Sequence, residues 1–227
     1  MVDVVCVGAH PDDVEIGMGA AIARMTRQGL TVGIIDLTNG EPTPHGTVET
    51  RRAEAARAAE ILGVRERRTL GQPNRYLMDT VQARTELAEA LRELRPSRLF
   101  VPYPLDAHPD HIAAHQIAVA ARFYSKFTKT EMRGEPHYPG RLYQYMAVHM
   151  RIAAEPSFVL DVSEDLGTKL KALSAYESQF VTNAGNTGII SLMEQTARMW
   201  GSLIGTAAGE PFFTPEPVGL STVSGLV

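Results

Sequence analysis

Two short segments rich in histidine and aspartate contain the residue types best suited to chemistry in this chain. The first reads His-Pro-Asp-Asp at residues 10–13, and the second reads His-Pro-Asp-His at residues 108–111. Histidine nitrogens and carboxylate oxygens are good zinc ligands, and a catalytic zinc keeps three protein ligands with one open position for water. A bound metal lowers the pKa of that water to roughly 7, and a neighbouring carboxylate can remove its proton. The two segments therefore indicate a metal site that performs hydrolysis.

The first segment also has a structural interpretation, because aspartate side chains accept hydrogen bonds from the free N–H groups that begin a helix. Either Asp12 or Asp13 could serve only as such a cap, and this segment alone does not separate the two interpretations. A cap accounts for one carboxylate, whereas a metal site accounts for His10 and both carboxylates. The second segment could be a histidine-rich surface loop, but the presence of the first segment favours the metal site.

Each segment lies between a predicted strand and a predicted helix. Short apolar runs at residues 3–7 and 98–101 are typical of buried strands, and the patterns at residues 16–28 and 112–124 are typical of helices. In an open α/β sheet, ligands bind beyond the carboxyl ends of the strands. Two loops of this kind can face each other across one sheet edge, which predicts a single site built from both segments.

Three side chains in these loops form a candidate metal-ligand set. His10 and Asp13 come from the first loop, where a spacing of three lets them converge across one turn, and His111 comes from the second loop. The remaining charged or polar residues of the two motifs are Asp12, His108 and Asp110. These groups would stay beside the metal, where hydrolysis needs a base, a donor to the oxyanion and a residue that orients this donor.

The rest of the chain alternates predicted strands and helices. Further strands are expected at residues 30–37, 67–70, 142–148 and 158–162, and further helices at 51–62, 79–94, 164–178 and 189–200. Such alternation predicts a Rossmann-like α/β fold with a mostly parallel sheet and helices on both faces. We expect one domain over residues 1–227, in which residues 1–127 form the core with both motifs and residues 128–227 form a smaller strand and helix extension.

Composition restricts the class of protein. The 227 residues carry a net charge of −4, which makes binding to nucleic acid or to an anionic membrane a poor prediction. No segment reaches the roughly 20 apolar residues of a membrane span. The single cysteine, Cys6, excludes an intramolecular disulfide and suits a reducing cytosol. A cleaved signal peptide would remove the first motif, so we expect a cytoplasmic protein.

Arg51 is a further candidate functional residue. It lies in the first turn of the predicted helix 51–62, where a positive charge opposes the helix dipole. This placement supports a functional role, such as holding a substrate hydroxyl or carboxylate. The alternative is a surface arginine paired with Glu49 or Glu54.

The paired motifs resemble those of the LmbE-like (PIG-L) zinc-dependent N-acetylglucosaminyl deacetylase family. Segments at residues 46–51, 59–63, 176–180 and 201–205 are similar to the bacillithiol-biosynthesis (BshB-type) deacetylase branch of this family. The resemblance implies a Zn²⁺-dependent hydrolase that removes the N-acetyl group from N-acetylglucosaminyl malate. It also implies a homo-oligomer, either a trimer or a hexamer. Two other family substrates, the mycothiol precursor and chitooligosaccharides, stay open as alternatives.

The resemblance also implies a role for each candidate residue. The three candidate ligands are predicted to hold one Zn²⁺ per subunit, although a site with two histidines and a carboxylate also accepts iron, cobalt or manganese. Asp12 is predicted to be the general base. His108 is predicted to bind the oxyanion with Asp110 orienting it, and either Asp12 or His108 protonates the leaving amine. Arg51 is predicted to contact the N-acetylated amino-sugar substrate.

Two positions depart from the family pattern, and two other classes of protein stay open. Asn74 replaces a family aspartate, and Ile189 stands where some members have a tyrosine near the oxyanion. One rival is a non-catalytic metal-binding or sugar-binding module with the same fold. The other is a nucleotide-binding Rossmann protein, suggested by the glycines within residues 17–19. The acidic first loop argues against this last class, because a pyrophosphate needs positive potential there.

Overall fold

The computed structural model describes residues 1–149 and 154–219, so parts of the predicted extension, residues 150–153 and 220–227, lie outside the described residues. The described strands are β1 (Val4–Gly8), β2 (Val32–Thr38), β3 (Glu66–Gln72), β4 (Arg98–Pro102), β5 (Arg141–Tyr145), β6 (Phe158–Asp161) and β7 (Gly209–Phe213). The described helices are α1 (Asp13–Arg27), α2 (Val48–Ile61), α3 (Val81–Leu94), α4 (Pro109–Tyr124), α5 (Leu166–Ser174), the π-helix η1 (Glu177–Val181) and α6 (Ile189–Leu203).

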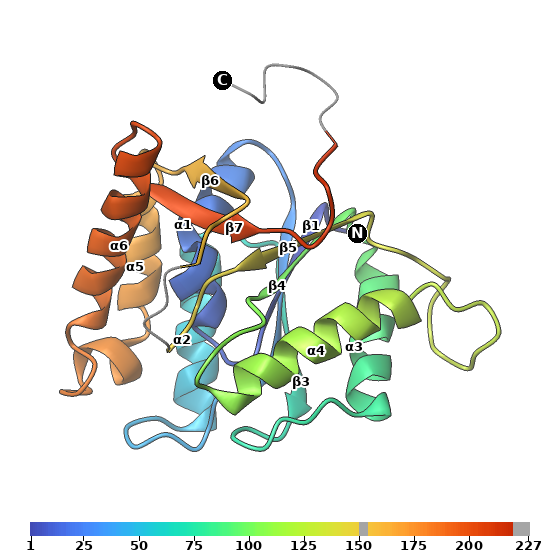
Figure 1. Cartoon of the computed structure of the whole chain (residues 1–227). Coiled ribbons are helices and arrows are strands. Elements are labelled where there is room, and N and C mark those ends of the chain that lie inside the picture. Colours follow the sequence, from blue (N-terminus) through green and yellow to red (C-terminus); the bar gives the residue numbers. More distant parts are fainter. Residues whose placement is uncertain (150–153, 220–227) are drawn as a thin grey trace.

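All of these strands belong to one sheet, with the order β3-β2-β1-β4-β5-β7-β6 (Figure 1). In this order, neighbouring strands pair in parallel among β3, β2, β1, β4 and β5. Strand β7 pairs antiparallel with both β5 and β6. Strand β1 is buried along its whole length, which explains its continuous run of apolar residues. The predicted mostly parallel α/β sheet is therefore confirmed. Because β1 and β4 are neighbours, the two motif loops leave the sheet side by side.

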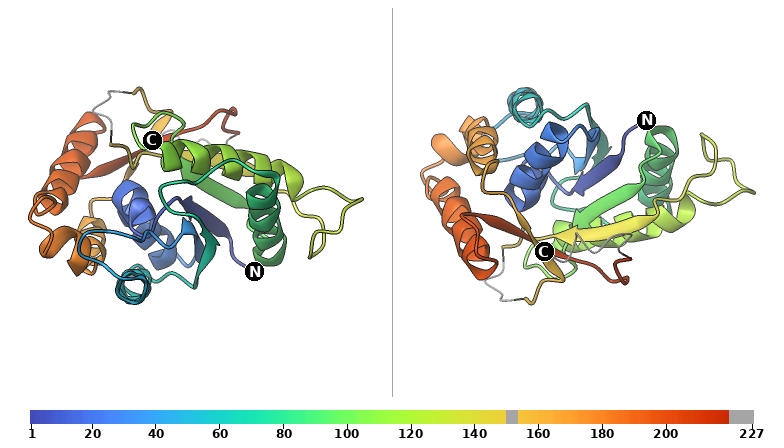
Figure 2. Two further views of the ribbon diagram at one scale, coloured as in Figure 1. Left: turned by 90° about the horizontal axis from the view of Figure 1, so that it is seen from below. Right: turned by 90° about the horizontal axis from the view of Figure 1, so that it is seen from above.

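Helices cover both faces of the sheet, as the sequence predicted (Figure 2). One face packs against α3 and α4, through residues such as Leu87, Leu91 and Ile117. The other face packs against α1, α2, α5 and α6, through residues such as Ile22 and Leu173. None of the helices in residues 1–149 and 154–219 combines the length and the hydropathy of a membrane-spanning segment.

The strand β7 was not predicted, because its sequence begins Gly-Glu-Pro and lacks an apolar start. In the fold its Glu210 is 2% exposed, and its carboxylate pairs with Lys169 Nζ at 2.6 Å. The same carboxylate accepts hydrogen bonds from the backbone nitrogens of Ala20 at 3.2 Å and Ala21 at 2.7 Å. A buried, paired carboxylate therefore joins the C-terminal strand to the middle of α1.

Helix α1 is kinked at Met18, whose φ is −150°. A side chain at Gly17 would overlap the ring of Tyr145, and a Cβ at Gly19 would lie 3.1 Å from Lys169 Cγ. The two glycines therefore let α1 pack closely against these two side chains. The kink separates the first turn, which carries Asp13, from the rest of the helix.

Candidate active site

The carboxyl ends of β1 and β4 bring three histidine rings together. The ring centroids of His10 and His108 are 4.9 Å apart, and those of His10 and His111 are 5.3 Å apart. His108 and His111 stack nearly parallel, with centroids 4.8 Å apart. Helix α4 begins at Pro109, three residues earlier than the sequence predicted, so His111 lies in its first turn. The two motif loops thus form one cluster, as expected from their positions after neighbouring strands.

The candidate ligands His10, Asp13 and His111 converge on one point. Their ligand atoms all lie within 4.8 Å of one another. Asp13 Oδ2 is 3.3 Å from His10 Nδ1, and Asp13 Oδ1 is 3.2 Å from His111 Nε2. His111 Nε2 is buried and has no hydrogen-bond partner within residues 1–149 and 154–219. Its approach to Asp13 Oδ1 is an ion-pair contact without a hydrogen bond, and a buried nitrogen with no hydrogen bond is costly, so this donor set fits a bound metal ion.

Each candidate ligand histidine also contacts a carboxylate other than Asp13 through its second ring nitrogen. Asp106 Oδ2 lies 2.6 Å from His111 Nδ1, and Asp110 Oδ2 lies 3.1 Å from His10 Nε2. Such carboxylate–histidine pairs fix the ring orientation and leave the metal-facing nitrogen as the lone-pair donor. Sequence reasoning missed Asp106, although a carboxylate in the loop between β4 and the second motif was a usable signal.

The predicted role of Asp110 needs a correction. Its carboxylate does not orient His108 but contacts His10 and accepts from the backbone nitrogens of Arg75 at 2.7 Å and Leu77 at 3.2 Å. The first turn of α4 directs this side chain toward the loop after β3. The backbone nitrogen of Asp110 donates to His108 Nδ1 at 3.1 Å instead. In the neutral ring the proton is therefore on His108 Nε2, which can donate to an oxyanion.

The pKa values of the histidines follow their surroundings. Burial lowers the pKa of His108, and the neighbouring His10 and His111 lower it further. Burial alone would also lower the pKa of the two ligand histidines, but adjacent carboxylates, first of all Asp13, outweigh it. They raise the pKa of His10 to about 9 and that of His111 to about 10 in the protein without metal. Metal binding must therefore displace protons from both rings.

Asp12 is a strained residue that does not cap α1. Its φ is 112°, and its side chain makes no cap hydrogen bond, so the capping interpretation is wrong for this residue. Its Oδ2 accepts from Nη1 and Nη2 of Arg51, both at 3.2 Å. Burial raises the pKa of Asp12 to about 6, although the Arg51 charge opposes this shift. Strain of this kind persists only where surrounding contacts hold it, and it clusters at functional sites.

Arg51 lies behind Asp12 and not on the surface. It is 3% exposed, and its Nη2 also donates to the carbonyl oxygen of Pro11 at 2.5 Å. The alternative of a surface arginine is therefore wrong. The predicted contact between Arg51 and the substrate stays a prediction, since the structure places the guanidinium on Asp12.

His149 and Ile189 are two further positions that bear on the candidate site. His149, which sequence reasoning missed, has its ring centroid 5.5 Å from that of His108 and donates its backbone N–H to Asp106 Oδ1 at 3.0 Å. This exposed histidine lies at the rim of the cluster. Ile189 begins α6 and packs against the core, so its side chain supplies no polar group.

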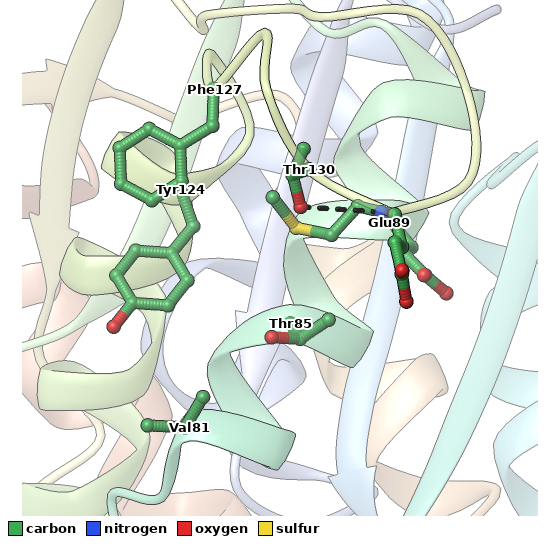
Figure 3. Close-up of a pocket in the computed structure, with 8 residues that line it drawn as sticks. Val81, Thr85, Glu89, Tyr124, Phe127 and Thr130 are labelled. Carbon is green, nitrogen blue, oxygen red and sulfur yellow. Dashed lines mark hydrogen bonds between the residues drawn. The ribbon is translucent and has the colours of Figure 1, made fainter.

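An open groove of about 450 Å³ lies elsewhere, between α3, the end of α4 and the loop that follows α4 (Figure 3). Its lining residues are Val81, Thr85, Glu89, Tyr124, Phe127, Thr130, Glu131 and Met132. None of them belongs to the histidine–carboxylate cluster. The groove is therefore separate from the candidate metal site.

Comparisons with known sequences agree with the motif resemblance. Residues 5–122 match the PIG-L family, described as GlcNAc-PI de-N-acetylase, and this span contains both motifs. The chain is 31% identical over 192 residues to diacetylchitobiose deacetylase from Thermococcus kodakarensis, which covers 78% of this chain and 70% of that protein. It is 34% identical over 172 residues to 1D-myo-inositol 2-acetamido-2-deoxy-α-D-glucopyranoside deacetylase from Nocardiopsis dassonvillei, covering 60% of each.

Solved structures share the whole fold. A conserved protein from Thermus thermophilus has a TM-score of 0.90 at 39% identity, with 97% of both chains covered. The 4-carboxy-2-hydroxymuconate hydratase from Pseudomonas putida has a TM-score of 0.84 at 20% identity, covering 98% of this chain and 99% of that one. That likeness shows the fold alone, because one fold can carry different reactions. On the sequence match across both motifs, the chain belongs to the PIG-L family of de-N-acetylases.

Proposed function

We propose that the protein hydrolyses the N-acetyl group of an N-acetylglucosamine conjugate, with release of acetate and a free amine. One observation carries the proposal: a buried His-Asp-His set, in which His111 Nε2 makes no hydrogen bond among the described residues, lies beside an aspartate and a histidine whose pKa is lowered. His10, Asp13 and His111 would hold Zn²⁺, although other divalent transition metals suit the same donor set. The sequence relatives that carry deacetylase names support this reaction class.

The residues around the candidate metal-ligand set supply the proton transfer and the oxyanion contact of the proposed reaction. When bound, the metal would polarise the acetyl carbonyl and lower the pKa of a water molecule. Asp12 takes the proton of the attacking water through Oδ1, which makes no hydrogen bond within the described ranges, while Arg51 holds Oδ2. His108 donates from Nε2 to the oxyanion that develops on the acetyl oxygen. The proton held by Asp12 is then available to the leaving amine.

The substrate we propose first is N-acetylglucosaminyl malate, on the resemblance of four further segments to the bacillithiol branch. Diacetylchitobiose and the N-acetylglucosaminyl inositol are the rivals, because the curated relatives carry those names. If Arg51 contacts the substrate as the sequence predicted, its replacement will raise KM. A cytoplasmic location, a single domain and a trimeric or hexameric assembly stay predictions.

The test combines metal content with acetate release in one preparation. We expect one metal per chain in the wild type and its loss in His10→Ala, together with the loss of acetate release. Asp12→Asn and His108→Ala are expected to keep the metal and to lower kcat by about 100-fold or more, because each removes a proton-transfer or oxyanion contact. His137→Ala is the matched control, since this histidine bonds the Pro96 carbonyl oxygen away from the cluster.

Several outcomes would overturn parts of this proposal. A wild type without stoichiometric metal, or with metal but without acetate release from any of the three substrates, would reject the reaction. Near-normal turnover in both Asp12→Asn and His108→Ala would reject the assigned roles. The ratio of kcat/KM values among the three conjugates decides which substrate is preferred.

A further inference from the structure

A chain of buried polar contacts runs from Asp12 into the core, away from the candidate metal site. Its first link is Arg51, which holds Asp12 Oδ2 and the carbonyl oxygen of Pro11. These contacts hold the strained backbone at Asp12 and fix its Oδ2, which leaves Oδ1 as the carboxylate oxygen that Arg51 does not contact. Any residue that fixes the guanidinium of Arg51 therefore also fixes the proposed general base.

Tyr176 is an aromatic residue that contacts the guanidinium of Arg51. It is fully buried, and Arg51 Cζ lies 5.5 Å from the centre of its ring. A guanidinium over an aromatic face is attracted by the ring quadrupole. Arg51 Nε has no hydrogen-bond partner in the part of the chain that the structure describes, and the carboxylate of Glu41 is 3.8 Å away. Besides Asp12 and the Pro11 carbonyl oxygen, the guanidinium is therefore contacted by the ring of Tyr176 and, at longer range, by the Glu41 carboxylate.

The ring is itself anchored through its hydroxyl group. Tyr176 donates a hydrogen bond of 2.9 Å to Glu15 Oε1, and Glu15 is fully buried in the first turn of α1. Arg67 on β3 pairs with the same carboxylate at 2.5 Å and with both oxygens of Asp36 on β2, at 2.7 and 2.9 Å. These buried ion pairs tie the anchor to two strands of the sheet. The hydroxyl of Tyr176 therefore links the ring that contacts Arg51 to the buried ion pairs between α1 and the sheet.

We propose that Tyr176 is a positioning residue for the deacetylation, which acts on Asp12 through Arg51 and does not touch the substrate. The inference rests on the proposed function, in which Asp12 is the general base. A residue that only positions the base changes the chemical step and not substrate binding. Its removal therefore lowers kcat and leaves KM unchanged.

The test replaces the hydroxyl alone, in Tyr176→Phe, and compares it with Tyr145→Phe. Both tyrosines are fully buried, and the hydroxyl of Tyr145 donates to the carbonyl oxygen of Val7 at 2.8 Å, outside the chain of contacts that leads to Asp12. We expect both variants to lose a similar amount of thermal stability. In Tyr176→Phe, kcat is expected to fall about 10-fold with KM within about twofold, because small misplacements of catalytic groups are costly. In Tyr145→Phe, kcat is expected to stay at the wild-type value.

Two further measurements separate positioning from general loosening of the fold. In the Arg51→Met background, Tyr176→Phe is expected to change kcat by less than about twofold, because its effect passes through the missing guanidinium. Glu15→Gln tests the anchor of the ring, and we expect kcat to fall at unchanged KM there too. Metal content is expected to equal that of the wild type in Tyr176→Phe.

The results also distinguish this inference from the proposed function. Acetate release by the wild type supports the function independently of Tyr176. The positioning role would be overturned if Tyr176→Phe kept the wild-type kcat or mainly raised KM. It would also be overturned if adding Tyr176→Phe to Arg51→Met lowered kcat by the same factor of about 10 as in the wild-type background. Absence of acetate release in the wild type would instead reject the function itself.

Discussion

Replacing Asp106 by asparagine should weaken metal binding by changing the tautomer of His111. Asp106 Oδ1 accepts from the backbone nitrogens of His108 and His149, both at 3.0 Å, and Oδ2 faces His111 Nδ1 at 2.6 Å. An asparagine that keeps its oxygen on the two backbone donors must turn its amide N–H toward Nδ1. That nitrogen then has to accept, and the ring proton moves to Nε2. The metal-facing nitrogen of His111 loses its free lone pair.

The size of the effect follows from the partner that is lost. Loss of a carboxylate behind a ligand histidine typically weakens metal affinity by about 10- to 100-fold. This corresponds to about 1.4 to 2.8 kcal/mol of binding free energy. Asp106 also holds two backbone groups of the loop, but the asparagine oxygen keeps those bonds, so the fold should lose little stability.

The assay is a competition titration of chelator-treated protein with Zn²⁺ and a chromophoric chelator. Glu54→Gln is the matched control, because it removes a buried carboxylate whose partners are the backbone nitrogen and hydroxyl of Ser178, at 2.7 and 2.8 Å. We expect the Kd of the control for Zn²⁺ to equal that of the wild type. Wild-type affinity in Asp106→Asn, or an equal loss in Glu54→Gln, would refute the tautomer argument.

Three further predictions concern stability. The folded pKa values of His10, about 9, and of His111, about 10, exceed the usual value of about 6.5, so protonation of both rings stabilises the metal-free fold. This stabilisation is complete below pH 6.5 and is lost as the pH rises through 9 to 10. The Tm of chelator-treated protein should therefore fall over this range, and a Tm that does not change with pH would contradict the raised pKa values of the two histidines. Glu210→Ala should lower the free energy of unfolding in urea by about 3 to 5 kcal/mol, because it leaves a buried lysine and two helix N–H groups without a partner; a loss under about 1 kcal/mol would disagree. Gly17→Ala should lower the free energy of unfolding by about 1 to 3 kcal/mol, because the added methyl group overlaps the buried ring of Tyr145. Gly167→Ala is the control, because its methyl group meets open space in a helix, and it should be neutral or stabilising by up to about 1 kcal/mol. Equal effects of the two substitutions would exclude the overlap.

The sequence by itself determined the alternation of strands and helices and the place of the candidate site. Both depend on local patterns, since apolar runs with a period of two or of 3.6 residues form strands or helices wherever the chain can bury them. The convergence of His10, Asp13 and His111 was also predictable, because two similar loops after neighbouring parallel strands open on the same edge of the sheet. Local sequence patterns were therefore enough to locate the candidate site.

Tertiary structure alone decided which polar groups act together. The carboxylate of Asp110 faces His10 and not its sequence neighbour His108, because the first turn of α4 directs it across to the other loop. Arg51 meets Asp12 and Tyr176 from three separate parts of the chain. No local pattern encodes such contacts, since they form only when the helices dock on the sheet.

The strand β7 shows the same limit for the fold. Its Gly-Glu-Pro start has a low strand propensity, yet Glu210 is buried there because Lys169 and the kinked helix α1, about 190 residues away in the sequence, satisfy its carboxylate. The identity of the residues sufficed to propose the candidate metal ligands, because histidine and aspartate are characteristic of such sites. It did not suffice for buried ion pairs, because their free energy depends on partners that only the folded chain brings within hydrogen-bond distance.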